Sequence, residues 1–303
     1  MSTSSPVRRR RASGPTDADL LFDTPGPRGR RRIALISGLT TVAVLALLAV
    51  VVLKLGHEGQ LAYPKWRYFL GQSVIRFLGR ALGETLAVTA VSAALSFPLG
   101  VALGWARLEA GRLGRAVIGA WVDAMRAVPM LLLIYFFLLA VPRFGPTLPS
   151  FWMLAIPIVM CTSATTAEVF RSGVLALDRG QGEAAMALGM SPGQTMRLVL
   201  APQALRLMLP TFITQLVTIL KDSSLGYAVS YAELMYAGKL LIANARAAVH
   251  LDVYLPTYVI IALLYTVMNW ALGALARGIE ARTRETRKTS GPSVRTRGPS
   301  LLR

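Results

Sequence analysis

The chain of 303 residues carries 33 Lys and Arg against 15 Asp and Glu, which gives a formal net charge of +18. Hydrophobic residues account for 54% of the sequence and charged residues for only 16%, against roughly 25% in a soluble domain. This composition excludes an ordinary soluble domain and indicates a membrane protein. Because the basic residues gather in the two tails, we expect them to set topology and to contact membrane lipid, with no role in nucleic-acid binding.

Few residues could form a disulfide or a metal site. Cys161 is the only cysteine, and His57 and His250 are the only histidines. A disulfide within the chain and a His-rich metal site are therefore excluded, and we expect no metal site.

The predicted fold is all-α and polytopic, with about six transmembrane helices. Each predicted span is an apolar run close to the roughly 20 residues that cross a bilayer core. In chain order the spans cover 33–53, 83–105, 119–141, 151–169, 211–230 and 253–275. The basic segments 1–32 and 281–303 are expected to be disordered tails, which leaves 33–53 as an extra N-terminal span and 60–280 as the main membrane domain.

Two further segments are amphipathic. Residues 54–77 alternate aromatic and basic side chains, which predicts a segment lying in the membrane interface. Residues 231–252 either form an outer lip of the molecule or lie in the interface, and the pattern does not choose between these two arrangements.

The distribution of Lys and Arg predicts that both termini are cytoplasmic. The segments rich in these residues are 1–32, 106–117, 169–210 and 276–303. Placing them inside satisfies the positive-inside rule with an even number of spans. We therefore expect a multi-pass protein of the cell membrane with the loop 170–210 in the cytoplasm.

Charged residues within the spans indicate a polar path or internal pairing, because each costs roughly 2.5–3.5 kcal/mol at a helix centre. Lys221 and Asp222 are adjacent, so they point about 100° apart on a helix and either line a path or form a structural pair. Arg126 and Asp123 either face the path or reach the cytoplasmic interface and organise packing. Glu168, at the inner end of its span, is expected at the interface.

The loop 170–210 is predicted to form a rigid helical elbow. The stretch EAAMALG consists of strong helix formers that end at Gly189, a good helix terminator. Ser191, Pro192 and Gln194 form a capping box for a second helix, which is expected to end at Pro202. Such an elbow either docks into a soluble partner or covers the end of the bundle.

This region resembles the inner-membrane permeases of ATP-binding-cassette (ABC) importers. Their cytoplasmic motif is Glu-Ala-Ala, three residues, Gly, nine residues, Ile-x-Leu-Pro, and the chain matches it at Glu183, Ala184, Ala185, Gly189 and Pro202. Val199 replaces Ile, and Ala201 replaces Leu, which removes a packing side chain. RAVPMLL at 126–132 and LKDSSLGYAVSYAEL at 220–234 are similar to the branch that imports polar amino acids, most of all to actinobacterial glutamate permeases.

The resemblance covers about 60–280 and implies a type I importer permease with a cytoplasmic coupling helix. It implies a second permease subunit, two ATP-binding subunits and an extracytoplasmic substrate-binding protein as partners. The elbow 183–202 would couple to the ATP-binding subunits, and Lys221, Asp222, Ser223 and Arg126 are expected along the path of the amino acid. ATP and Mg would bind only to the partners, because this chain lacks a G-x-x-x-x-G-K loop, so we expect no enzyme activity and no cofactor in it.

Three other functions are alternatives to an importer permease. An ion-coupled secondary transporter or channel would use Lys221 and Asp222 as a relay but leaves the elbow unexplained. An intramembrane enzyme lacks an H-E-x-x-H or G-x-S-x-G motif and a carboxylate cluster. A scaffold that docks ATPases without transporting is the third.

Overall fold

The structure is a computed structural model that describes residues 26–289, with the side chains at 27, 276, 277 and 279–289 left out. The chain divides into two units after Ala62. Most of the predicted tails, residues 1–25 and 290–303, lie outside the described residues.

The described part of the first unit, residues 26–62, contains one long helix, α2 (Pro27–His57). It is long and apolar enough to cross a membrane, in agreement with the extra span predicted at 33–53. The helix begins at Pro27 rather than at 33, because proline suits a first helical turn and the arginines that follow are good helix formers.

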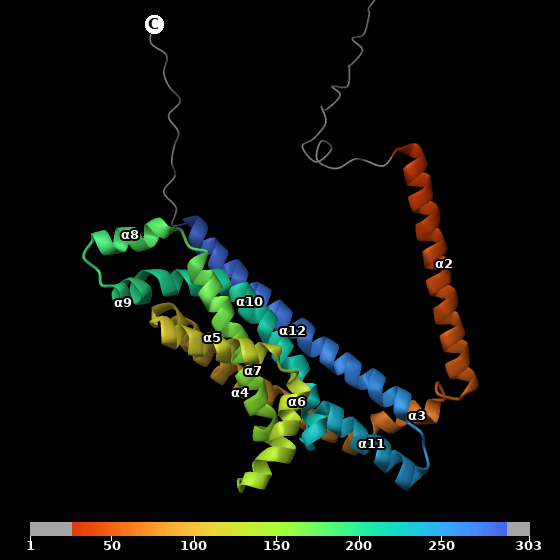
Figure 1. Cartoon of the computed structure of the whole chain (residues 1–303). Coiled ribbons are helices and arrows are strands. Elements are labelled where there is room, and N and C mark those ends of the chain that lie inside the picture. Colours follow the sequence, from red (N-terminus) through yellow and green to blue (C-terminus); the bar gives the residue numbers. More distant parts are fainter. Residues whose placement is uncertain (1–25, 290–303) are drawn as a thin grey trace, which may run out of the picture. The chain divides into compact units, whose positions relative to one another are not determined.

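The described part of the second unit, residues 63–289, is built from helices joined by short loops (Figure 1). Its helices are α3 (Tyr63–Arg67), α4 (Gln72–Glu109), α5 (Arg112–Ala127), α6 (Met130–Tyr135), α7 (Ser150–Leu175), α8 (Arg179–Ala187), α9 (Pro192–Thr195), α10 (Ala201–Asp222), α11 (Leu234–Val249) and α12 (Tyr254–Thr289). Among the described residues, five helical segments of the chain could each cross a membrane, and one bent pair of helices would make a sixth span. The all-α fold with about six spans is therefore confirmed.

The predicted span 119–141 is wrong as a single helix. It is split between α5 and the segment Met130–Phe144, which meet at an angle of 99°. The break falls where Val128 and Pro129 adopt extended backbone angles. Proline disfavours the helical conformation of the residue before it, and it has no N–H for the helix ladder.

The predicted tail 281–303 also begins too early, because α12 continues to Thr289. The Arg, Glu and Ala residues of this stretch are strong helix formers. Their charge indicated a tail, but it did not prevent the helix from extending beyond the apolar span.

Helices α4 and α7 form the closest pair in the bundle, and glycines permit their approach. A Cβ added at Gly100 would lie 2.6 Å from the carbonyl oxygen of Ser163, and one at Gly104 would lie 2.5 Å from that of Ala167. The two glycines are four residues apart and so lie on one face of α4, as in the small-residue interfaces of membrane helices. The α4 backbone is thereby held directly against α7.

The end of the bundle that carries the start of α11 is fixed by a buried carboxylate. Glu233 is fully buried and caps α11 by accepting hydrogen bonds from the backbone N–H groups of Met235 (2.6 Å) and Tyr236 (2.7 Å). The Tyr265 hydroxyl of α12 donates to the same carboxylate at 3.0 Å, and the Leu234 N–H donates to Thr85 of α4 at 3.2 Å. These bonds tie α11 to α4 and α12.

Candidate functional site: the elbow and the polar interior

The elbow begins with a capped helix, α8, that projects from one end of the bundle (Figure 1). The Asp178 side chain accepts a hydrogen bond from the Gly180 N–H at 2.7 Å and so starts the helix. The helix ends at Ala187, and Gly189 follows with φ of +82°. Only glycine adopts this backbone angle without steric cost, which explains its position in the turn.

The second limb of the elbow starts as the sequence predicted. The Ser191 hydroxyl accepts a hydrogen bond from the Gln194 N–H, and the Gln194 side chain accepts one from the Ser191 N–H at 2.9 Å. This capping box opens α9 with Pro192 in its first turn.

The predicted end of this limb at Pro202 is wrong. A π-helical turn, Met196–Leu200, leads directly into α10, and Pro202 lies in the first turn of α10. Proline is tolerated there because the N–H groups of a first turn need no partner within the helix. The elbow is thus continuous with the span that carries Lys221 and Asp222.

Of the residues that match the Glu-Ala-Ala motif, one is buried and four are exposed to solvent. Ala185 is buried against the bundle, whereas Glu183, Ala184, Gly189 and Pro202 are exposed. Large apolar side chains nearby are exposed too, with 52% of Met186 and 84% of Leu188 open to solvent. An exposed apolar tip on a rigid helix is typical of a surface that contacts another protein.

A cleft of about 590 Å³ lies between the elbow and the end of α4. Its lining residues are Leu108, Glu109, Gly182, Met186, Pro192, Gly193, Thr195, Met196 and Leu200. Both limbs of the elbow contribute to this cleft, so the elbow is a folded unit with its own concave surface.

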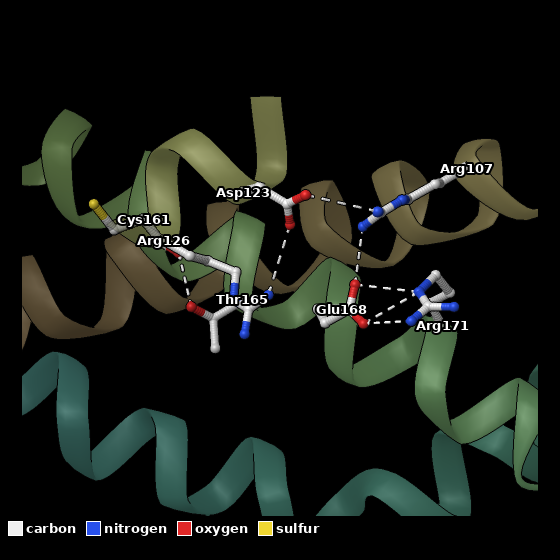
Figure 2. A network of polar contacts seen from close by, with 7 residues as sticks. All are labelled: Arg107, Asp123, Arg126, Cys161, Thr165, Glu168 and Arg171. Carbon is white, nitrogen blue, oxygen red and sulfur yellow. Dashed lines mark hydrogen bonds and ion pairs between the residues drawn. The ribbon is translucent and has the colours of Figure 1, made fainter. Parts of the chain in front are cut away.

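Five charged residues on α4, α5 and α7 form a network (Figure 2). The Glu168 carboxylate of α7 accepts hydrogen bonds from Arg107 of α4 at 2.9 Å and from Arg171 of α7 at 2.5 Å. Arg107 also lies 3.9 Å from Asp123 of α5, which in turn lies 3.9 Å from Arg126. The network therefore connects α4, α5 and α7.

The network shows what holds these side chains, and the expected interfacial place of Glu168 stays a prediction. Glu168 is partly buried between two arginines, because Arg107, 61 residues away in the sequence, reaches it. Asp123 and Arg126 are exposed and pair with each other and with the network, as expected of residues that organise helix packing. Among the described residues, no hydrogen bond or ion pair joins Arg126 to Lys221, Asp222 or Ser223.

Lys221, Asp222 and Ser223 lie together at the end of α10, with different exposure. Lys221 is exposed and Asp222 is half-buried. Ser223 is fully buried, and its hydroxyl donates to the Leu220 carbonyl oxygen at 2.7 Å. The lysine and the aspartate thus face different surroundings, as their adjacency requires.

Sequence reasoning missed Gln215, two helical turns before Asp222. Its side-chain oxygen accepts a hydrogen bond from the Thr166 hydroxyl of α7 at 2.7 Å. Its Nε2 is buried without a hydrogen-bond partner in the described structure. Such a donor normally has a partner, so its place is suited to a polar group that arrives from outside the chain. The available signal was a lone amide within the apolar run TFITQLVTIL.

Residues 96–285 match the family described as the binding-protein-dependent transport system inner membrane component. The chain belongs to this family of membrane permeases. The match begins within α4 and extends into α12, so it includes the elbow, the charged network and the end of α10.

Two similar proteins are named as permeases of amino-acid transport systems. The glutamate transport system permease protein GluD of Corynebacterium glutamicum is 35% identical over 238 residues, which cover 77% of this chain and 85% of the relative. The probable glutamine ABC transporter permease protein GlnP of Bacillus subtilis is 32% identical and covers 70% and 95%. A solved structure described as an amino acid ABC transporter with histidines has a TM-score of 0.63 at 25% identity, covering 69% of this chain and 95% of that one.

The permease fold is that of a type I ABC importer. A bacterial transporter that imports the acidic polysaccharide alginate shares it at 13% identity with a TM-score of 0.58. The family description itself implies a substrate-binding protein, and importers of this kind depend on ATP-binding subunits.

Proposed function

We propose that the chain is the permease subunit of an ABC importer that moves a polar amino acid, most specifically glutamate, into the cytoplasm. The observation that carries the proposal is the capped elbow from Glu183 to Pro202, with its exposed apolar tip, in a permease fold. The name of the relative from Corynebacterium glutamicum supports glutamate, while the name of the relative from Bacillus subtilis makes glutamine the competing substrate.

The assembly that we propose contains a second permease subunit, two ATP-binding subunits and an extracytoplasmic binding protein. Both termini of this chain are cytoplasmic, which places the elbow on the side of the ATP-binding subunits. ATP and Mg bind to those subunits, and this chain binds no cofactor. ATP binding draws the elbows together, and the spans rock so that the path opens outward.

The polar path is proposed to follow α10. Lys221, Asp222 and Ser223 stand at one end, and the unpartnered Nε2 of Gln215 offers a hydrogen bond to a carboxylate or amide of the substrate. Arg126, exposed near the cytoplasmic end, is proposed to meet the substrate as it leaves. Charged and polar groups within a span are best accounted for by such a cavity.

The elbow is tested by substituting Gly189. Gly189→Val places a β-branched residue at φ of +82°, so we expect it to distort the turn and to abolish co-purification with the ATP-binding subunit. Gly189→Asn is the matched control, because asparagine tolerates positive φ, and it keeps docking. Normal docking and uptake with Gly189→Val would show that the elbow does not couple this chain to ATP hydrolysis.

The substrate is tested by uptake of radiolabelled glutamate in cells that lack this chain, with aspartate, glutamine, arginine and histidine as competitors. The proposal is supported if ATP-dependent glutamate uptake is lost in these cells, returns when the gene is restored, and is then inhibited mainly by aspartate. If only glutamine uptake depends on the chain, the protein is still an importer permease but its substrate is glutamine. Uptake that follows an ion gradient instead of ATP would favour the secondary transporter.

A further inference from the structure

A second pocket is lined by α11, the start of α12 and Tyr227. Helix α11 lies at the opposite end of the bundle from α8 of the elbow (Figure 1). The pocket has a volume of about 760 Å³. It is lined by Tyr227, Met235, Lys239, Ile242, Ala243, Arg246, Ala247, Tyr254 and Tyr258. In the topology that we propose, this pocket opens on the extracytoplasmic side.

Two cations lie on the α11 wall of the pocket. Lys239 and Arg246 are seven residues apart, so they share one face of the helix and their Cα atoms are about 10 Å apart. Arg246 lies over the ring of Tyr254, 5.3 Å from its centre. Lys239 is exposed and has no ion-pair partner among the residues that the structure describes.

Only one of the described carboxylates, Asp252, forms an ion pair with either of these cations. Asp252 lies 4.0 Å from Arg246, and the two side chains are 47% and 62% exposed, which leaves most of the arginine's charge available. Glu233, at the start of α11, does not line the pocket, and its buried carboxylate accepts hydrogen bonds from the start of α11 and from Tyr265. The pocket lining therefore carries two cations and no carboxylate, with Asp252 next to Arg246.

This charge pattern is the complement of an acidic amino acid. Such a molecule carries two carboxylates and one ammonium group. The pocket lining offers two cations, and Asp252 lies beside one of them, Arg246. The tyrosine rings add faces that attract an ammonium group and hydroxyls that bond to either end. Tyr227 belongs to the turn Ser223–Val229 that directly follows Asp222, so the pocket adjoins the path proposed above.

We propose that this pocket is an outer entry site for the acidic amino acid, in which Lys239 and Arg246 bind its two carboxylates. The inference rests on the proposed function and adds to it a site that selects glutamate over glutamine by charge. Lipid phosphate shares the anionic chemistry, so the test separates the two sources.

The test uses the assembled importer in phosphatidylcholine nanodiscs. Cys161 is replaced by Ser and Ala243 by Cys, so that a maleimide reports on the pocket. We expect L-glutamate to slow the labelling and L-glutamine not to. Lys239→Gln and Arg246→Gln should each raise the half-protecting glutamate concentration about tenfold, the loss expected for one charge-assisted hydrogen bond.

The matched control is Arg143→Gln, which removes an exposed basic side chain from another loop outside the pocket and should leave the protection unchanged. Labelling that ignores glutamate in an importer that takes up glutamate would overturn the entry site. Labelling that instead slows when phosphatidylglycerol replaces part of the lipid would also overturn it and identify a lipid site.

Failure of the proposed function gives a different result. If the reconstituted parent importer shows no ATP-driven glutamate uptake with its binding protein, the substrate assignment fails whatever the labelling shows. If uptake is normal but glutamate does not protect the pocket cysteine from maleimide, the importer function is supported and the entry site is refuted.

Discussion

Replacing Glu168 by glutamine should destabilise the bundle and loosen its connection to the elbow. The substitution keeps the size of the side chain but removes the charge that two guanidinium groups share. Arg171 would lose its ion-pair partner, and Arg107 would keep only the more distant Asp123 at 3.9 Å, while the two guanidinium groups remain close together.

The magnitude follows from how far these groups are buried. The side chains of Glu168, Arg107 and Arg171 are 22%, 19% and 31% exposed, between those of a surface pair and a buried one. A surface pair contributes less than about 1 kcal/mol, and breaking a buried one costs about 3–5 kcal/mol, so we expect a loss of about 2 kcal/mol. For a chain of this size, that loss lowers the melting temperature by about 5 °C.

The assay is thermal unfolding of the detergent-purified chain, followed by tryptophan fluorescence. Asp252→Asn is the control, because its pair with Arg246 spans 4.0 Å and is largely exposed, and it should change the melting temperature little. Equal melting temperatures for Glu168→Gln and the unmodified chain would refute the idea that the network holds the helices together.

Three further changes test separate features. Gly104→Val would drive a side chain into the carbonyl oxygen of Ala167, only 2.5 Å from an added Cβ, so we expect little folded protein by size-exclusion chromatography. Ser191→Ala removes the capping-box acceptor and should cost about 1 kcal/mol, measured as faster proteolysis of the elbow. Burial raises the pKa of Glu233 from 4.5 to about 7, against the opposing effect of its backbone hydrogen bonds. The folded state therefore holds this proton more tightly, so stability should fall as the pH rises from 4.5 to 7, by up to about 3 kcal/mol, and Glu233→Gln should flatten this slope in melting curves.

Features that depend on neighbouring residues in the sequence were predicted well. The turn at Gly189 and the capping box of Ser191 and Gln194 are local, because each needs only the backbone within a few residues. The signal for the bend at Pro129 was present as well, but the continuous apolar run around it favoured a single span. Hydrophobicity identifies which segment of the chain can lie in a membrane, but it does not show whether that segment forms one straight helix or two helices with a bend.

Features that need a distant partner were not predictable. Glu168 owes its position to Arg107 on another helix, and the free Nε2 of Gln215 follows from where Thr166 lies on α7. A single sequence contains the polar residues but not the pairs that they form. Charge within a span indicated that a polar interior exists without showing which residues compose it.

The position of the charged network connects the elbow to the spans. Glu168 and Arg171 lie on the last turns of α7, which ends at Leu175, and the cap of α8 follows at Asp178. Only a short link separates α7 from α8, so a displacement of α8 is transmitted directly to α7. Because Arg107 pairs with Glu168, and Asp123 with Arg107, that displacement is passed on to α4 and α5 as well. At its other end the elbow continues through Pro202 into α10 without a break, so a movement of the elbow acts on the helix that carries Gln215 and Asp222 at the same time as on α7.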